Sequence, residues 1–159
     1  MRDAFGGAFM IKLLIVFIVI YIGFTAIALN YAKAFKVKNK VIAYIEENEI
    51  TSIRNMSAKA KEDMNRYFQE ELVEENNYKY GIKCPNDKQL YDYCDNGILI
   101  VSSDSTGSNK IGTYYTVTTT FGWEIPFLNV LLRLNDQDGS ITTGYWTISG
   151  ETRTIVNET

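Results

Sequence analysis

The chain contains no histidine among its 159 residues, which removes the side chain most often used as a general base or a metal ligand. Two cysteines are too few for a cysteine-rich zinc site. The net charge of −3 offers no basic surface of the kind that binds nucleic acid. The sequence also lacks a phosphate-binding loop and a nucleophile motif. We therefore expect no catalytic site, no metal or other cofactor and no nucleic-acid partner, and we predict that the protein is not an enzyme.

Charge is absent from one long stretch, residues 13–32, which reads LLIVFIVIYIGFTAIALNYA. These twenty residues, at about 1.5 Å each, match the roughly 30 Å hydrocarbon core of a bilayer. Neither proline nor glycine interrupts residues 29–47, where apolar side chains recur at helical spacing. We predict one helix over 13–50, first membrane-spanning and then amphipathic. A short leader-like segment over 1–12 precedes it, and an extracytoplasmic α+β domain over 51–159 follows it.

The polar part combines one more helix with a sheet. A helix is predicted over 57–75, because apolar side chains recur every four residues at Met56, Ala60, Met64, Phe68 and Leu72. Beyond Gly97 the period changes to the alternation of β-strands, predicted over 98–102, 111–121, 128–134, 141–149 and 152–156. Turn-rich sequences at 104–109, 121–126 and 135–140 separate them. The fold class is therefore α+β, with a four- to five-stranded antiparallel sheet whose apolar face the two helices cover.

Two groups of glutamates are candidates for a cation site: Glu46, Glu47 and Glu49, and Glu70, Glu71, Glu74 and Glu75. Such runs on helix surfaces are usually solvated, and we interpret both groups in that way. Residues 136–139 (DQDG) share a few positions with a calcium loop, but the glutamate that must follow is absent. We therefore predict a hairpin turn at residues 136–139.

The two cysteines, Cys84 and Cys94, lie in a polar loop with nine residues between them. The spacing is compatible with a disulfide that closes a hairpin, which would stabilise the fold by roughly 2–3 kcal/mol. Two unpaired thiols are the alternative. The lysines after the apolar stretch favour a cytoplasmic polar part by the positive-inside rule. The cysteine spacing and the Thr- and Tyr-rich strands favour the outside, and we predict that orientation.

Three interpretations of the N-terminal segment remain open. It is a cleaved signal peptide, for which Ala26-Ile27-Ala28 is the cleavage-like sequence, a plain signal anchor, or a pilin-type N-terminus. In a pilin-type N-terminus a short leader ends at glycine and the apolar helix begins immediately.

The order of these segments resembles bacterial type IV pilin-like subunits, including the TadE-like pseudopilins of tight-adherence pili. The resemblance lies in the leader-like MRDAFGG, the apolar run after it, the long helix to Glu47 and the terminal sheet. It implies processing at Gly7 and a structural role in a surface filament or secretion apparatus. It also implies that the lipid bilayer and other pilin-like subunits are the partners, contacted through helix-packing residues that we take to be Leu13, Phe17, Gly23, Phe24 and Ala28.

Cleavage after Gly7 would make Lys12 the fifth residue of the mature chain, where type IV pilins normally carry glutamate. The alternative is therefore a monomeric, membrane-anchored extracytoplasmic binding domain.

Overall fold

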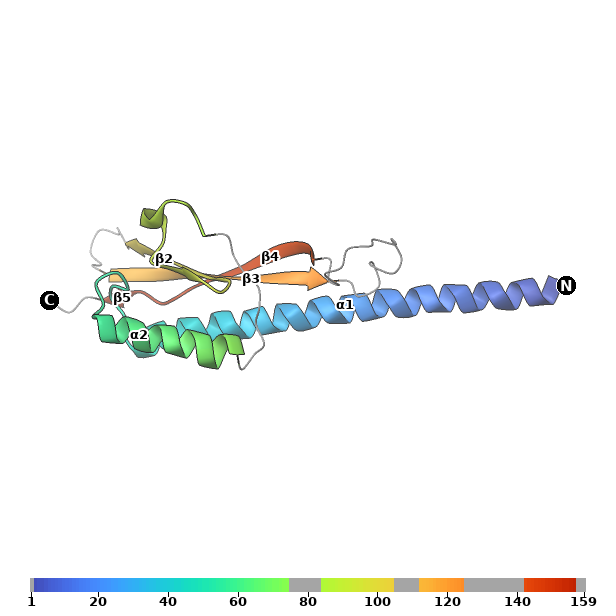
Figure 1. Cartoon of the computed structure of the whole chain (residues 1–159), viewed down its shortest axis with the longest axis horizontal. Helices are drawn as coiled ribbons and strands as arrows, with labels where there is room; N and C mark the ends of the chain where they lie inside the picture. The colour runs from blue at the N-terminus through green and yellow to red at the C-terminus, as the bar shows by residue number, and fades with distance from the viewer. Residues whose placement is uncertain (1, 75–83, 105–111, 125–141, 157–159) are drawn as a thin grey trace. The chain divides into compact units, whose positions relative to one another are not determined.

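The computed structural model describes residues 2–74, 84–104, 112–124 and 142–156. The helices are α1 (Arg2–Glu47) and α2 (Ala58–Tyr67), with a π-helical turn η1 (Phe68–Glu74) and a 3-10 turn η2 (Lys88–Leu90). The strands are β1 (Tyr93–Asp95), β2 (Ile98–Asp104), β3 (Gly112–Glu124), β4 (Thr142–Glu151) and β5 (Ile155–Val156) (Figure 1). The α+β class predicted from the sequence is confirmed.

The chain forms two compact units, which are described separately below. The helix unit comprises residues 1–31 and 122–145, and the sheet unit comprises residues 32–121 and 146–159. Within the helix unit, Asn30 Nδ2 donates a hydrogen bond to the carbonyl oxygen of Gly122 at 3.3 Å. The buried hydrophobic core lies in the sheet unit.

Helix α1 begins earlier and ends earlier than predicted. It is already helical at Arg2, so the helix includes residues 2–12, which were predicted to precede it. Its end is a Schellman turn, in which Glu49 N bonds to Glu46 O at 3.3 Å and Ile50 N bonds to Ile45 O at 3.1 Å. This turn places Glu49 in the left-handed region, with φ 45°, and it stops the helix before the predicted end at residue 50.

Helix α2 begins after Ser57, whose hydroxyl caps the helix by accepting a hydrogen bond from Ala60 N at 3.3 Å. The segment is α-helical only to Tyr67 and continues as η1, whereas the sequence predicted a single α-helix over 57–75. The predicted apolar stripe nevertheless faces the core, since Met64, Phe68 and Leu72 are all buried.

The strand order is β1-β2-β3-β4, and β5 pairs with the beginning of β3. Strands β1 and β2 form a tight hairpin through Asn96 and Gly97, which both have positive φ values (47° and 80°) as a type I′ turn requires. Strand β2 pairs antiparallel with β3 from Ile98 opposite Thr119 to Asp104 opposite Thr113.

The core is the apolar side of this sheet covered by the second part of α1 and by α2, as the sequence predicted (Figure 1).

Strand β3 alternates as expected, and it runs on to Glu124, so the turn predicted over 121–126 begins too early. The buried side chain of Phe121 keeps that part of the strand in the core pattern. The predicted strand over 128–134 and the predicted turn at 136–139 lie outside the described residues. The fully buried large side chains are Val37, Val41, Ile45, Met64, Phe68, Leu72, Ile98, Ile100, Tyr115, Val117 and Phe121.

Candidate membrane and assembly surface

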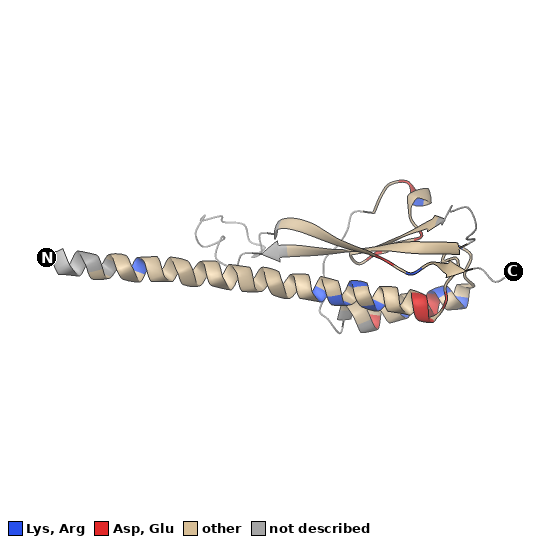
Figure 2. Ribbon diagram, turned by 180° about the vertical axis from the view of Figure 1, so that it is seen from behind, with Lys and Arg blue, Asp and Glu red and all other residues tan. Residues whose placement is uncertain are grey.

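Helix α1 holds the one stretch among the described residues that is long and apolar enough to cross a bilayer, Phe9–Glu47. Only 6% of its most apolar 18-residue window is buried within the chain. The core helix of a soluble protein would be mostly buried, so α1 differs from such a helix, and its exposed apolar surface is compatible with a membrane span. Figure 2 shows a long uncharged length within this stretch, with basic charge before it and a basic group after it along α1.

The predicted helix-packing residues are mostly exposed. Leu13, Phe17 and Phe24 are 42%, 62% and 69% exposed, and Ala28 is exposed as well. Gly23 is buried by its own helix, yet a Cβ added to it would meet no atom within 4 Å outside that helix backbone. The same space surrounds Gly7, which lies inside α1. Nothing in the described chain therefore requires glycine at either position.

Lys38 is buried, although the other lysines near it in the sequence suggest a solvated side chain. Its side chain is 8% exposed, and its Nζ lies 4.4 Å from the centre of the Phe35 ring. Gly150 of β4 lies against it, since a Cβ on Gly150 would stand 3.0 Å from Lys38 Nζ. Lys38 is one of the four lysines that follow the apolar stretch, with Lys33, Lys36 and Lys40, and the structure places it between α1 and the sheet.

Cys84 and Cys94 form the predicted disulfide, with 5.9 Å between their Cα atoms. Cys94 lies in the middle of β1, so the bond ties the segment before η2 to the edge of the sheet. A disulfide is typical of proteins that fold in an oxidising compartment. The alternative of two unpaired thiols does not fit this geometry.

Arg54 joins the turn after α1 to the segment around η2, a contact that no sequence pattern predicted. Its Nε lies 2.5 Å from Asp92 Oδ1, and its Nη2 donates hydrogen bonds to the carbonyl oxygens of Gln89 and Tyr91 at 2.6 and 3.2 Å. The Asp92 side chain is only 3% exposed, and its other oxygen accepts a hydrogen bond from Ser102 N. This buried carboxylate is thus held by one cation and one backbone N–H.

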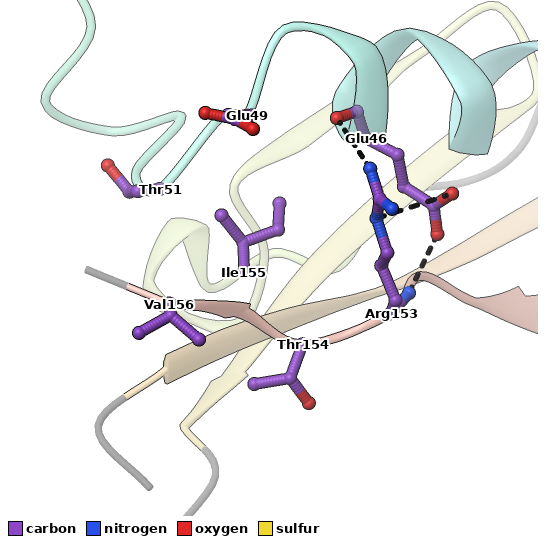
Figure 3. A pocket seen from close by; sticks show the side chains of 7 residues that line it. All are labelled: Glu46, Glu49, Thr51, Arg153, Thr154, Ile155 and Val156. Carbon is purple, nitrogen blue, oxygen red and sulfur yellow. Dashed lines mark hydrogen bonds and ion pairs between the residues drawn. The ribbon is translucent and has the colours of Figure 1, made fainter. Parts of the chain in front are cut away.

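An open hollow of about 510 Å³ lies between the end of α1 and β5 (Figure 3). Glu46, Glu49 and Thr51 line one side, and residues 153–156 line the other. Arg153 binds Glu46 twice. Its backbone N donates a hydrogen bond to Glu46 Oε1 at 2.7 Å, and its Nη2 donates one to Glu46 O at 3.4 Å. The interpretation of this glutamate group as solvated is therefore wrong for Glu46, whose side chain is 26% exposed and paired.

A second hollow, of about 530 Å³, lies beside α2 and β1, and Lys61, Gln69, Asp92 and Asp95 are among its lining residues. Gln69 Nε2 donates to Asp95 Oδ2 at 3.2 Å, and Asn96 Nδ2 donates to the same oxygen at 3.0 Å. Within the described ranges, no three Asp, Glu, Cys or His side chains gather into a group that could hold a metal ion.

Two tyrosines, the half-buried Tyr93 and the buried Tyr115, connect the sheet to the helices and the turn after α1. The Tyr93 ring contacts the Phe68 ring edge-on, 5.3 Å between centres, and burial, with a contribution from Asp95, raises the pKa of Tyr93 to about 12. The Tyr115 hydroxyl accepts a hydrogen bond from Ile53 N at 3.3 Å. Burial raises the pKa of Tyr115, the bond from Ile53 lowers it, and the nearby charge of Asp92 raises it further.

No known family model matches the chain, and neither a curated protein nor a solved structure matches it.

Proposed function

We propose that the protein is a structural pilin-like or pseudopilin subunit of a bacterial surface filament or secretion apparatus. In this proposal the apolar part of α1 is stored in the membrane and then packs against the same helix of neighbouring subunits. The sheet unit is extracytoplasmic and forms the outer part of the assembly, and the protein has no catalytic role.

The continuity of α1 carries this proposal. One helix runs without a break from Arg2 to Glu47. Most of its described large apolar side chains up to Phe35 are exposed, whereas Ala34, Val37 and Val41 are fully buried in the sheet unit. A simple membrane anchor needs only a helix that spans the bilayer. A helix that belongs to both the span and a folded core instead transmits contacts between spans to the rest of the subunit.

Gly23 supports assembly through helix contacts. Glycine inside a helix costs about 1 kcal/mol relative to alanine, and no intrachain neighbour needs the space. Small residues allow two helices to approach closely in a membrane, where close packing rather than the hydrophobic effect drives association. The proposed role of Gly23 is therefore to seat a neighbouring helix.

The first test is fractionation of the native host followed by N-terminal sequencing. A filament subunit is expected in sheared surface material, with a new N-terminus after Gly7 if a prepilin peptidase acts. If the whole population stays with the membranes and keeps Met1, the proposal fails and the membrane-anchored binding domain becomes the better description.

A matched pair of variants tests helix packing. Gly23→Leu adds bulk at the proposed contact, and Thr25→Leu adds the same side chain two residues away, on nearly the opposite face of the helix. We expect Gly23→Leu to abolish recovery in sheared material and Thr25→Leu to retain it. The Cys84–Cys94 disulfide reports in both variants whether the sheet unit has folded. Equal assembly of the two variants would argue against a glycine-dependent contact.

The external orientation is tested through the same disulfide. Free thiols are alkylated at the moment of cell lysis, and the mobility of the chain is then compared under reducing and non-reducing conditions. An exported sheet unit is expected to be oxidised, whereas the cytoplasm keeps most thiols reduced. Cys84→Ser supplies the reference for the open form. A fully alkylated wild-type chain would contradict the external orientation.

A further inference from the structure

Two large aromatic side chains remain exposed at one end of the sheet unit. Trp146 of β4 is 57% exposed and Phe35 of α1 is 42% exposed. The Trp146 ring packs edge-on against Phe121, with 5.9 Å between ring centres, and Phe121 is buried in the core. The Phe35 ring carries Lys38 Nζ on its face. Both rings are therefore held by the fold while much of their surface is presented outward.

The contacts of β3 show that both rings lie at the same end of the sheet unit. Near the beginning of β3, the Tyr115 hydroxyl contacts Ile53, just beyond the end of α1. Four residues later, Thr119 Oγ1 donates to Ala34 O at 3.0 Å, beside Phe35. Phe121, and with it Trp146, comes next along the strand. This end is the one at which α1 enters the sheet unit at Ala32.

Basic side chains lie close to Phe35 in the sequence. Lys33 and Lys36 lie on either side of Phe35 in the sequence, the first half-buried and the second exposed. Figure 2 shows this basic group where the uncharged length of α1 ends. We define the interfacial patch as Lys33, Phe35, Lys36 and Trp146. Aromatic rings with basic neighbours are the side chains that favour the boundary between acyl chains and lipid headgroups.

We propose that the interfacial patch enters the headgroup layer of an anionic bilayer, with Trp146 and Phe35 at the acyl boundary and Lys33 and Lys36 on lipid phosphates. The uncharged stretch over 13–32 is as long as the hydrocarbon core is thick, so residue 33 falls where the headgroups begin. Lys36 is only about 4.5 Å further along the helix axis than residue 33, at about 1.5 Å per residue. The proposal rests on the candidate span and is independent of filament assembly.

Fluorescence quenching in vesicles tests the position of Trp146. Trp123→Phe makes Trp146 the single tryptophan of the full chain, which is reconstituted at high dilution into vesicles of phosphatidylcholine and phosphatidylglycerol. Lipids brominated near the headgroup should quench Trp146 strongly, and its quenching constant with aqueous acrylamide should be several-fold lower than in the control. If Trp123→Phe fails to form the disulfide, Trp123→Tyr replaces it.

The control places the only tryptophan at the other end of the sheet unit, by Leu90→Trp in a chain that also carries Trp123→Phe and Trp146→Phe. Leu90 is 60% exposed in η2, next to Gln89, whose carbonyl accepts the bond from Arg54. This probe should respond to acrylamide and not to brominated lipid. Equal responses of Trp146 and the control would overturn the proposal. Protection of Trp146 that appears only at high protein density, without quenching by lipid, would mean that a second copy covers the patch, and would also overturn it.

The lipid charge is tested with Lys33→Gln/Lys36→Gln in the same single-tryptophan chain. The parent chain should lose part of the Trp146 protection when phosphatidylglycerol is replaced by phosphatidylcholine, and the double variant should show the lower protection in both vesicles. If the double variant still responds fully to phosphatidylglycerol, Lys33 and Lys36 do not bind the lipid phosphates. Loss of filaments has no bearing on any of these readouts, so the two proposals fail separately.

Discussion

Gly150 of β4 and Lys38 of α1 lie so close that a Cβ on the glycine would be in tight contact with the lysine side chain. A Cβ built on Gly150 stands 3.0 Å from Lys38 Nζ and 3.1 Å from both Lys38 Cδ and Ile42 Cδ1. The absence of a side chain on the strand thus creates the space in which the lysine is buried.

We expect Gly150→Val to destabilise the sheet unit by about 1–3 kcal/mol, because it overpacks this contact. Gly150→Ala should change stability by less than about 1 kcal/mol, since the flexible end of Lys38 can shift. Lys38→Ala in the Gly150→Val background should recover part of the loss. Urea denaturation of the full chain in detergent, followed by near-ultraviolet circular dichroism, measures all three. Strict additivity of the two substitutions would contradict the contact.

The burial of Lys38 also shows where sequence reasoning reaches its limit. Helical spacing correctly placed Val37, Val41 and Ile45 in the core, and alternation did the same for Tyr115 and Val117. Both patterns are local, so they can be read from the chain alone. A lysine buried beneath a glycine of a distant strand depends on a tertiary approach that no local pattern encodes.

The β1–β2 hairpin has a local signal in the sequence. Asn96-Gly97 is the dipeptide best suited to a two-residue hairpin turn, because both of its residues must adopt positive φ. A loop and a short hairpin are the two predictions for the polar segment before Gly97, and the structure shows the hairpin. In contrast, the contacts of Arg54 with Asp92, Gln89 and Tyr91 produce no periodic pattern in the sequence, because they join irregular segments that are far apart along the chain.

Glu49 occupies the position at the end of α1 where glycine is usually found. Its φ of 45° is uncommon for a residue with a side chain. We expect Glu49→Gly to stabilise the chain by up to about 1 kcal/mol through relief of this backbone strain, offset by greater freedom in the unfolded state. Glu49→Ala removes the carboxylate but keeps the Cβ, and should bring no such gain. If both substitutions shift the urea midpoint equally, the change in stability comes from loss of the Glu49 charge and not from relief of backbone strain.

Arg54 should matter far more than an exposed arginine in a similar ion pair. Arg54→Ala leaves the buried Asp92 carboxylate without its cation, and we expect a loss of about 2–3 kcal/mol, reduced from the fully buried case because Arg54 is 49% exposed. Arg66 pairs with Asp63 at 2.9 Å, but both side chains are exposed. Arg66→Ala should therefore cost less than about 1 kcal/mol.

A conservative substitution separates charge from geometry at the same position. Arg54→Lys keeps the cation, but an ammonium group cannot reproduce the planar fork that contacts Asp92 and the two carbonyl oxygens together. Its stability should lie between wild type and Arg54→Ala. If Arg54→Lys equals the wild type in chemical denaturation, the carbonyl contacts contribute nothing.

Tyr93 should make stability depend on alkaline pH. Its pKa is raised from 10.0 in the unfolded chain to about 12 in the fold, mainly by burial. The neutral phenol is therefore favoured in the folded state, and its contribution is fully present below pH 10 and is lost as the pH rises from about 10 to 12. The unfolding free energy measured between pH 9 and 11 should fall less steeply in Tyr93→Phe.

Tyr115→Phe is the informative comparison, because Tyr115 also has a raised pKa but its hydroxyl accepts the hydrogen bond from Ile53 N. Its removal leaves a buried N–H without that acceptor, at a cost of about 1–3 kcal/mol. Tyr115→Phe should therefore lose stability already at neutral pH, whereas Tyr93→Phe should act mainly on the alkaline slope. A slope that is unchanged in Tyr93→Phe would show that burial against Phe68 does not hold this phenol in its neutral form.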